Sequence, residues 1–201
     1  MSSNLTPPAP PLAFPPLDHT LLSARTVIRG FQPTDAEALY AEVVASREHI
    51  ARWLPWAYEH TNVDYTRNLI TRFQAEWQAG AATYGIFARQ PDDSSGDQAG
   101  ALLGGLGLHS RQPDVPSFEI GYWLAQSAEG HGYMTEAASA LVEYALSALG
   151  AQRVEIRCNA RNTRSAAVAQ RLGFTQEALL HNDRRAHDGS LRDTLIFARW
   201  V

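Results

Sequence analysis

The chain has 201 residues, of which 45% are hydrophobic and 19% are charged, and its formal net charge is −4. This composition fits one globular domain and excludes collagenous, disulfide-dense and compositionally disordered proteins. The acidic balance argues against nucleic acid as a partner, because phosphate binding normally requires a basic surface. No stretch reaches the ~20 apolar residues that cross a bilayer, and the first residues lack a signal-peptide pattern. We therefore expect a cytoplasmic protein with no membrane partner.

Prolines dominate the start of the chain, where six of the eleven fall within residues 7–16. Proline lacks a backbone N–H and fixes its own backbone angle, so this stretch is not expected to form a helix or a central strand. The sequence predicts a flexible proline-rich leader over residues 1–20 and one folded domain over residues 21–201.

The first predicted elements are a strand followed by two helices. The apolar run of residues 22–31 predicts the strand. Thr34 and Glu37 have the spacing of a capping box, which predicts that a helix begins there. Asn62 is the expected cap of a second helix over residues 64–78.

The remaining elements alternate between strands and helices. Apolar alternation predicts strands over residues 83–89, 102–110, 117–124, 154–158, 174–181 and 191–200. Helices are expected over residues 133–149 and 163–172, each followed by a glycine. The order predicts an α/β fold: a single domain with a mixed, mostly antiparallel sheet flanked by helices.

The single cysteine, Cys158, cannot form an internal disulfide. It ends the alternating run that begins at Val154, which predicts a half-buried strand residue. A lone cysteine is also compatible with a catalytic nucleophile. We expect the packing role.

A glycine-containing loop, Gly130-His131-Gly132, connects a predicted strand to a predicted helix. Backbone amides at the start of a helix form a site for a pyrophosphate, and glycine lets the backbone approach the phosphates closely. The same pattern also serves as a flexible turn before a helix, so the loop alone does not define a ligand.

Three separated motifs extend this interpretation. They are residues 46–56, with two tryptophans, residues 119–137, with the glycine loop, and residues 154–174, which end in Arg171-Leu-Gly-Phe174. In this order they resemble the acceptor segment, the pyrophosphate loop and the following strand and helix of the RimJ/RimL-type branch of the GNAT superfamily of N-acetyltransferases. The resemblance covers residues 22–201.

The resemblance implies a GNAT-like domain whose fourth and fifth strands splay apart, with acetyl-CoA as co-substrate and no metal. The implied cofactor-binding residues are Trp123, Leu124, Ala125, Gly130, His131, Gly132, Tyr133, Met134, Thr135 and Asn162. The superfamily consensus opens the loop with Gln or Arg, and here Ser127 takes that position. This departure concerns one side-chain contact and leaves the backbone amides in place.

The implied reaction is direct attack of a primary amine on the thioester. Ser165 is the implied acid for the departing sulfur, although a serine at a helix start is also a common cap. The branch's carboxylate base is replaced by Arg184, which cannot accept a proton at neutral pH. We expect Glu119 as the base instead, with Asp183, His109 or a chain of water molecules as alternatives.

Trp53, Trp56 and Tyr58 are expected to border the acceptor cleft, although such a cluster also commonly forms core. The acceptor is either a protein N-terminus, such as that of a ribosomal protein, or a small-molecule amine. A homodimer is compatible with the sequence. The rival function is a non-catalytic acyl-CoA-binding or sensing module, which the missing carboxylate at position 184 favours.

Overall fold

A computed structural model gives the fold and describes residues 19–77, 79–90, 98–112, 115–186 and 188–201. The predicted leader lies outside these ranges except for its last two residues. No helix in the described ranges combines the length and the apolar character of a membrane span.

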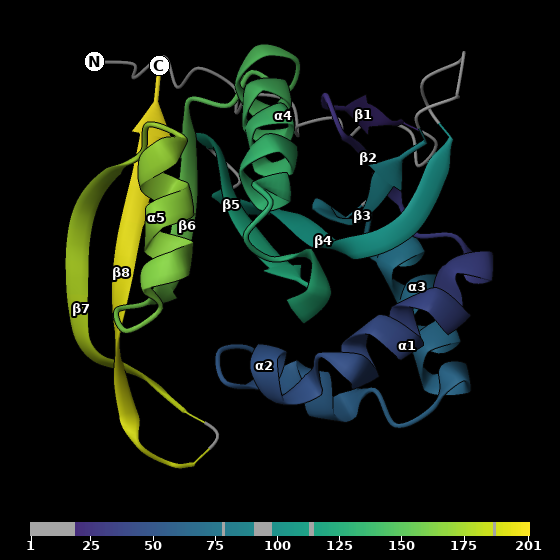
Figure 1. Ribbon diagram of the computed structural model, residues 1–201. Coiled ribbons are helices and arrows are strands. Elements are labelled where there is room, and N and C mark those ends of the chain that lie inside the picture. Colours follow the sequence, from purple (N-terminus) through teal and green to yellow (C-terminus); the bar gives the residue numbers. More distant parts are fainter. Residues whose placement is uncertain (1–18, 78, 91–97, 113–114, 187) are drawn as a thin grey trace, which may run out of the picture.

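The core of the molecule is one mixed sheet (Figure 1). Its strands are β1 (Leu21–Leu22), β2 (Thr26–Gly30), β3 (Ala81–Arg89), β4 (Ala99–Gln112), β5 (Val115–Leu124), β6 (Arg153–Asn159), β7 (Thr175–Arg185) and β8 (Leu191–Trp200). Their order in the described sheet is β1-β2-β3-β4-β5-β6-β8-β7, and β5–β6 is the parallel pair among antiparallel ones. The predicted fold class, mixed and mostly antiparallel, is confirmed.

The parallel strands β5 and β6 separate soon after they pair. Their register joins Ser117 to Arg153, Phe118 to Val154 and Glu119 to Glu155, and it goes no further along these two described strands. Beyond the last pair, the two backbones present unpaired edges to the gap between them. This is the expected splay of the fourth and fifth strands. The labels differ by one because the predicted strand over residues 22–31 is divided into the short β1 and β2.

Helices cover both faces of the sheet. They are α1 (Ala36–Ala45), α2 (Arg47–Ala51), α3 (Val63–Trp77), α4 (Tyr133–Ser147) and α5 (Thr163–Arg171), with 3₁₀ turns η1 (Pro33–Asp35), η2 (Pro55–Glu59) and η3 (Gln126–Ala128). Neighbouring residues of a strand face opposite sides of a sheet. Accordingly, Ile86 belongs to the buried cluster under α4 and α5, whereas Phe87 belongs to the cluster under α1 and α2.

The start of α1 differs from its prediction. The expected capping box between Thr34 and Glu37 is wrong, because the box lies two positions earlier, between Gln32 and Asp35 at the start of η1. The Gln32 N–H donates to Asp35 Oδ2 at 2.7 Å, and the Arg29 guanidinium holds both carboxylate oxygens at 2.7 and 2.9 Å. An arginine on β2 thus decides which residue of this turn accepts the backbone hydrogen bond.

Candidate active site

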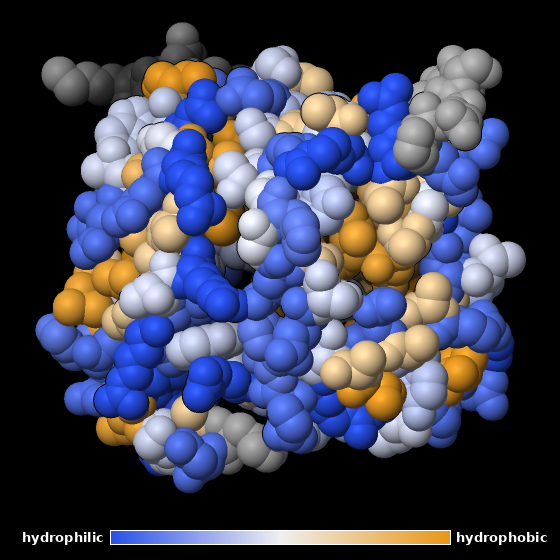
Figure 2. Space-filling view, in the orientation of Figure 1, coloured by the Kyte–Doolittle hydropathy of each residue, from blue (hydrophilic) through white to orange (hydrophobic). Residues whose placement is uncertain are grey.

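The gap between β5 and β6 opens into a cleft of about 1050 Å³. A second cavity of about 680 Å³ adjoins it on the side of α2. The residues that line both are His49, Trp53, Glu129, Gly130, Asn162, Thr163 and Arg164. In the space-filling view a hollow lies near the middle of the face, surrounded mainly by hydrophilic residues (Figure 2). A cleft of this size accommodates a small-molecule ligand.

The glycine loop lies at one end of this cleft. Gly130 and Gly132 have φ values of +81° and +85°, a region that favours glycine, and Gly132 is the N-cap of α4. Within the described chain, no amide from Gly130 to Thr135 donates to a backbone carbonyl. These amides, at the positive end of α4, fit a pyrophosphate.

An arginine of the β1–β2 turn supports the loop from its other side. Arg25 Nη2 donates to the carbonyl oxygen of His131 at 2.7 Å, and the same guanidinium pairs with Glu136 in the first turn of α4. This contact fixes the loop to the sheet, so the amides are ordered before any ligand arrives.

Two hydroxyl groups meet where β5 passes α5. Ser165 Oγ donates to the Tyr122 hydroxyl at 3.0 Å, and that hydroxyl donates to the Ser165 carbonyl oxygen at 3.0 Å. Burial raises the pKa of Tyr122, so its hydroxyl stays protonated at neutral pH. Burial likewise raises the pKa of the nearby Cys158 thiol, which disfavours the nucleophilic thiolate. Tyr122 was not predicted as a site residue.

Asn162, predicted to contact the cofactor, is the N-cap of α5. Its Oδ1 accepts the Ser165 N–H at 3.1 Å, so Asn162 rather than Ser165 satisfies the helix start. Both residues line the cleft.

Glu119 lies at the apex of the gap, in the last pair of residues that join β5 to β6. Its Oε2 is 3.3 Å from Arg111 Nη1 and 3.6 Å from Arg157 Nε. Because three positions separate Glu119 from Tyr122 on the strand, the two side chains face opposite sides of the sheet. Glu119 and Ser165 therefore approach the gap from opposite faces.

The alternative bases lie farther from the cleft. His109 is exposed on β4 directly opposite Glu119 in the register, and Asp183 on β7 is 3.6 Å from Arg184. Arg184 is among the described residues that line the cleft, whereas His109 and Asp183 are not.

Of the three predicted acceptor residues, one lines the cleft in the described chain and two do not. Trp53 lines both cavities, and its carbonyl oxygen accepts from Arg192 Nη1 at 3.2 Å. Trp56 packs edge-on against Trp123, with ring centroids 5.8 Å apart, and lies outside the described lining. Tyr58 is exposed and donates to Glu48.

Some of the predicted cofactor-binding residues line the cleft in the described chain, and others do not. Those that line the cleft are Trp123, Leu124, Gly130, Gly132, Met134, Thr135 and Asn162. Ala125 is fully buried, and its N–H donates to the Leu103 carbonyl at 2.9 Å. The rings of His131 and Tyr133 stack on each other with centroids 5.8 Å apart.

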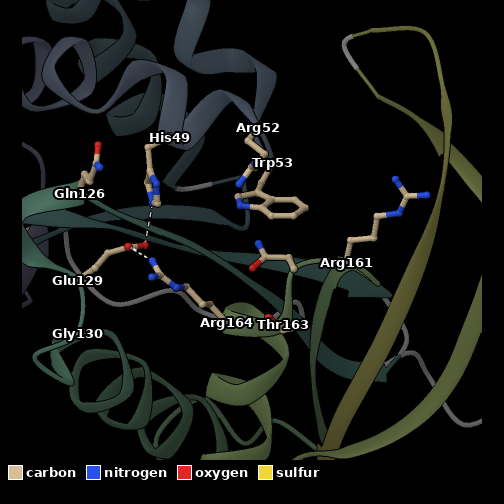
Figure 3. Close-up of a pocket in the computed structure, with 10 residues that line it drawn as sticks. His49, Arg52, Trp53, Gln126, Glu129, Gly130, Arg161, Thr163 and Arg164 are labelled. Atoms are coloured by element: carbon tan, nitrogen blue, oxygen red, sulfur yellow. Dashed lines mark hydrogen bonds and ion pairs between the residues drawn. The ribbon is translucent and has the colours of Figure 1, made fainter.

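Glu129 was missed by sequence reasoning, and its place directly before Gly130 was the available signal. Its carboxylate accepts from Arg164 of α5 and lies 2.8 Å from His49 Nε2 of α2, as the dashed lines in Figure 3 show. One carboxylate thus connects the glycine loop to two helices across the mouth of the cleft.

Residues 25–175 match the family model described as an acetyltransferase (GNAT) domain. The chain therefore belongs to the GNAT acetyltransferase family, and the predicted enzyme class is confirmed.

Particular relatives support the RimJ/RimL-type branch. YdaF of Bacillus subtilis (strain 168), named as a candidate ribosomal N-acetyltransferase, is 32% identical over 167 residues, which are 81% of each chain. The ribosomal-protein-serine acetyltransferase of Escherichia coli (strain K12) is 32% identical over 100 residues, which are 50% of this chain and 55% of that one. The structure of the ribosomal L7/L12 alpha-N-protein acetyltransferase RimL with coenzyme A matches the fold with a TM-score of 0.80 at 24% identity, covering 91% and 98% of the two chains.

Proposed function

We propose that this protein transfers the acetyl group of acetyl-CoA to the N-terminal amine of a ribosomal protein in the cytoplasm. The observation that carries the proposal is the splayed gap between β5 and β6. The glycine loop lies at one end of this gap, and the Ser165–Tyr122 hydroxyl pair lines it. The names of YdaF and of the Escherichia coli relative support a ribosomal acceptor. We assign the catalytic domain to residues 21–201.

The residues of the cleft fit acetyl-CoA. The amides from Gly130 to Thr135 suit its pyrophosphate, and Arg171 Nη1 donates to Thr135 Oγ1 at 3.2 Å, which brings a cation to the same helix start. The unpaired edges of β5 and β6 suit the amide groups of its pantetheine arm.

When bound, acetyl-CoA supplies a thioester carbonyl carbon, to which the amine nitrogen bonds as the carbon–sulfur bond breaks. Ser165 is our candidate to give a proton to the departing sulfur, and the Tyr122 hydroxyl, which now donates to the Ser165 carbonyl oxygen, would return a proton to Ser165 Oγ after it rotates. On the other face of the sheet, Glu119 is our candidate to take the proton that the amine loses. The two proton transfers balance, and no metal is required.

The test is a coupled measurement of thiol release and peptide mass. The protein is incubated with acetyl-CoA and peptides copied from ribosomal-protein N-termini, and the matched control is each peptide with a blocked N-terminus. Thiol release with one added acetyl group on the free peptides alone is expected. The chain contains no lysine, so self-acetylation of lysine side chains cannot contribute. Release with small amines but with none of the peptides would contradict the proposed acceptor, and binding of acetyl-CoA without any transfer would favour a sensing module.

A further inference from the structure

Arginine side chains outnumber the carboxylates that line the cleft, although the chain as a whole has a net charge of −4. Each lining carboxylate in the described chain already has a cationic partner: Glu119 has Arg111 and Arg157, Glu129 has His49 and Arg164, and Glu136 has Arg25. Arg52 and Arg161 line the smaller cavity and form no ion pair with the described residues. The lining of the cleft therefore carries net positive charge, and the nearby carboxylate that interacts electrostatically with Arg161, Asp193, already binds His181.

This positive charge lies away from the glycine loop. In Figure 3, Arg161 and Gly130 lie at opposite ends of the pocket, and Arg52 extends from the end of α2 beside Trp53. Arg192 of β8 adds a third guanidinium, whose Nε is buried and has no hydrogen-bond partner among the described residues. Three cations thus surround the end of the cleft that the Trp53 side chain borders.

We propose that Arg52, Arg161 and Arg192 form a subsite for acidic side chains of the acceptor, so that the enzyme prefers N-termini followed within a few residues by Asp or Glu. The inference rests on the proposed function and specifies its substrate class. Guanidinium groups bind carboxylates through paired hydrogen bonds, and a partly enclosed cleft strengthens such contacts.

The placement favours the acceptor over the coenzyme as the source of negative charge. Phosphates are expected at the amides of the glycine loop, near Arg171, because the free N–H groups and the helix dipole lie there. The acceptor amine must reach the gap beside Ser165, and its chain then leaves past Trp53, between Arg52 and Arg161.

The test compares pairs of peptides that begin with the same serine and differ only by Asp and Glu or by Asn and Gln at positions three to five. Wild-type kcat/KM is expected to be about tenfold higher for the acidic peptide, the value of one charge-assisted hydrogen bond. Arg52→Gln and Arg161→Gln should bring the ratio of the two kcat/KM values towards one. Raising the NaCl concentration should also reduce the wild-type ratio. Arg72→Gln, an exposed arginine of α3, is the matched control and should keep the ratio.

Three results would overturn the subsite. Equal kcat/KM for both peptides with the wild type removes it and leaves the acetyltransferase function intact. A raised KM for acetyl-CoA with an unchanged peptide ratio in Arg52→Gln or Arg161→Gln would assign these arginines to the coenzyme. If the wild type acetylates neither peptide, the proposed function itself fails, and the subsite fails with it.

Discussion

The hydroxyls of Ser165 and Tyr122 share one hydrogen-bond system at the point where the strands part. A serine in the first turn of a helix can act as a proton donor or can cap the helix. The structure gives the cap to Asn162, whose side chain accepts the Ser165 N–H. The Ser165 hydroxyl therefore does not cap the helix, and it donates to Tyr122 in the lining of the cleft.

Ser165→Ala should lower turnover by roughly 10²-fold or more, because the departing thiolate loses its proton donor. The affinity for acetyl-CoA should change little, since the backbone amides of the loop are untouched. A thiol-release assay measures kcat, and a binding titration measures the affinity for acetyl-CoA. Tyr122→Phe keeps the ring and should produce a smaller loss. Normal turnover with about 1 kcal/mol less stability in Ser165→Ala would instead describe a structural residue.

Glu119→Gln should depress the rate at neutral pH and recover part of it at high pH, where the free amine is abundant. Asp183→Asn should have little effect, because Asp183 lies outside the described lining of the cleft. The pH–rate profiles of both variants show whether Glu119 or Asp183 is the base. Glu119 also pairs with Arg111 and Arg157, so thermal midpoints must accompany the rates. A severe loss in Asp183→Asn with a normal Glu119→Gln enzyme would place the base on β7.

The segment from the end of β5 to the start of α4 shows how one element presents consecutive backbone amides to the cleft. Two glycines with positive φ turn the chain so that consecutive amides lie at a helix start. The sequence indicated this loop correctly, because glycine spacing and helix periodicity are local properties.

Gly132→Val should weaken acetyl-CoA binding while the fold is retained. The new side chain requires a strained φ of +85°, and its Cβ would lie 3.3 Å from Arg25 Nη2. Gly150→Val is the matched control: its φ is +65°, and its Cβ meets nothing within 4 Å at the far end of α4. Calorimetric titration with acetyl-CoA measures the affinity of both. Unchanged affinity in folded Gly132→Val would remove the pyrophosphate site from this loop.

For the whole molecule, a buried histidine connects pH to stability. His60 follows η2, is 2% exposed, and its Nδ1 lies 3.0 Å from Thr66 Oγ1 of α3. Burial lowers the pKa of His60 to about 4. Unfolded histidine binds its proton near pH 6.5, so this contribution is present above pH 6.5 and declines as the pH falls towards 4.

Wild-type stability should therefore fall by about 2 kcal/mol from this residue between pH 7 and pH 5. Urea unfolding at the two pH values measures it, and His60→Asn should show a smaller fall over the same range. Equal falls in the two proteins would mean that His60 titrates normally.

Sequence periodicity and cap residues determined most of the element order. The Asn62 cap is confirmed, since its Oδ1 accepts the Tyr65 N–H at 2.8 Å, and the predicted strands 83–89 and 102–110 are present as parts of β3 and β4. These features depend on residues close in the chain, so a single sequence contains them. The Thr34 capping box failed because Arg29, on a different element, bound Asp35.

Which side chains share the cleft depends on contacts between residues far apart in the chain. Trp53 and Arg192 meet although 139 residues separate them, and His49 meets Glu129 across 80 residues. Trp56 turned to pack on Trp123 because strand alternation and the position of η2 direct it there. A strand's register and a helix's rotation set the direction of each side chain, and both depend on partners distant in sequence. Local patterns along the chain therefore predicted the family and the glycine loop, whereas contacts between distant elements set the composition of the cleft.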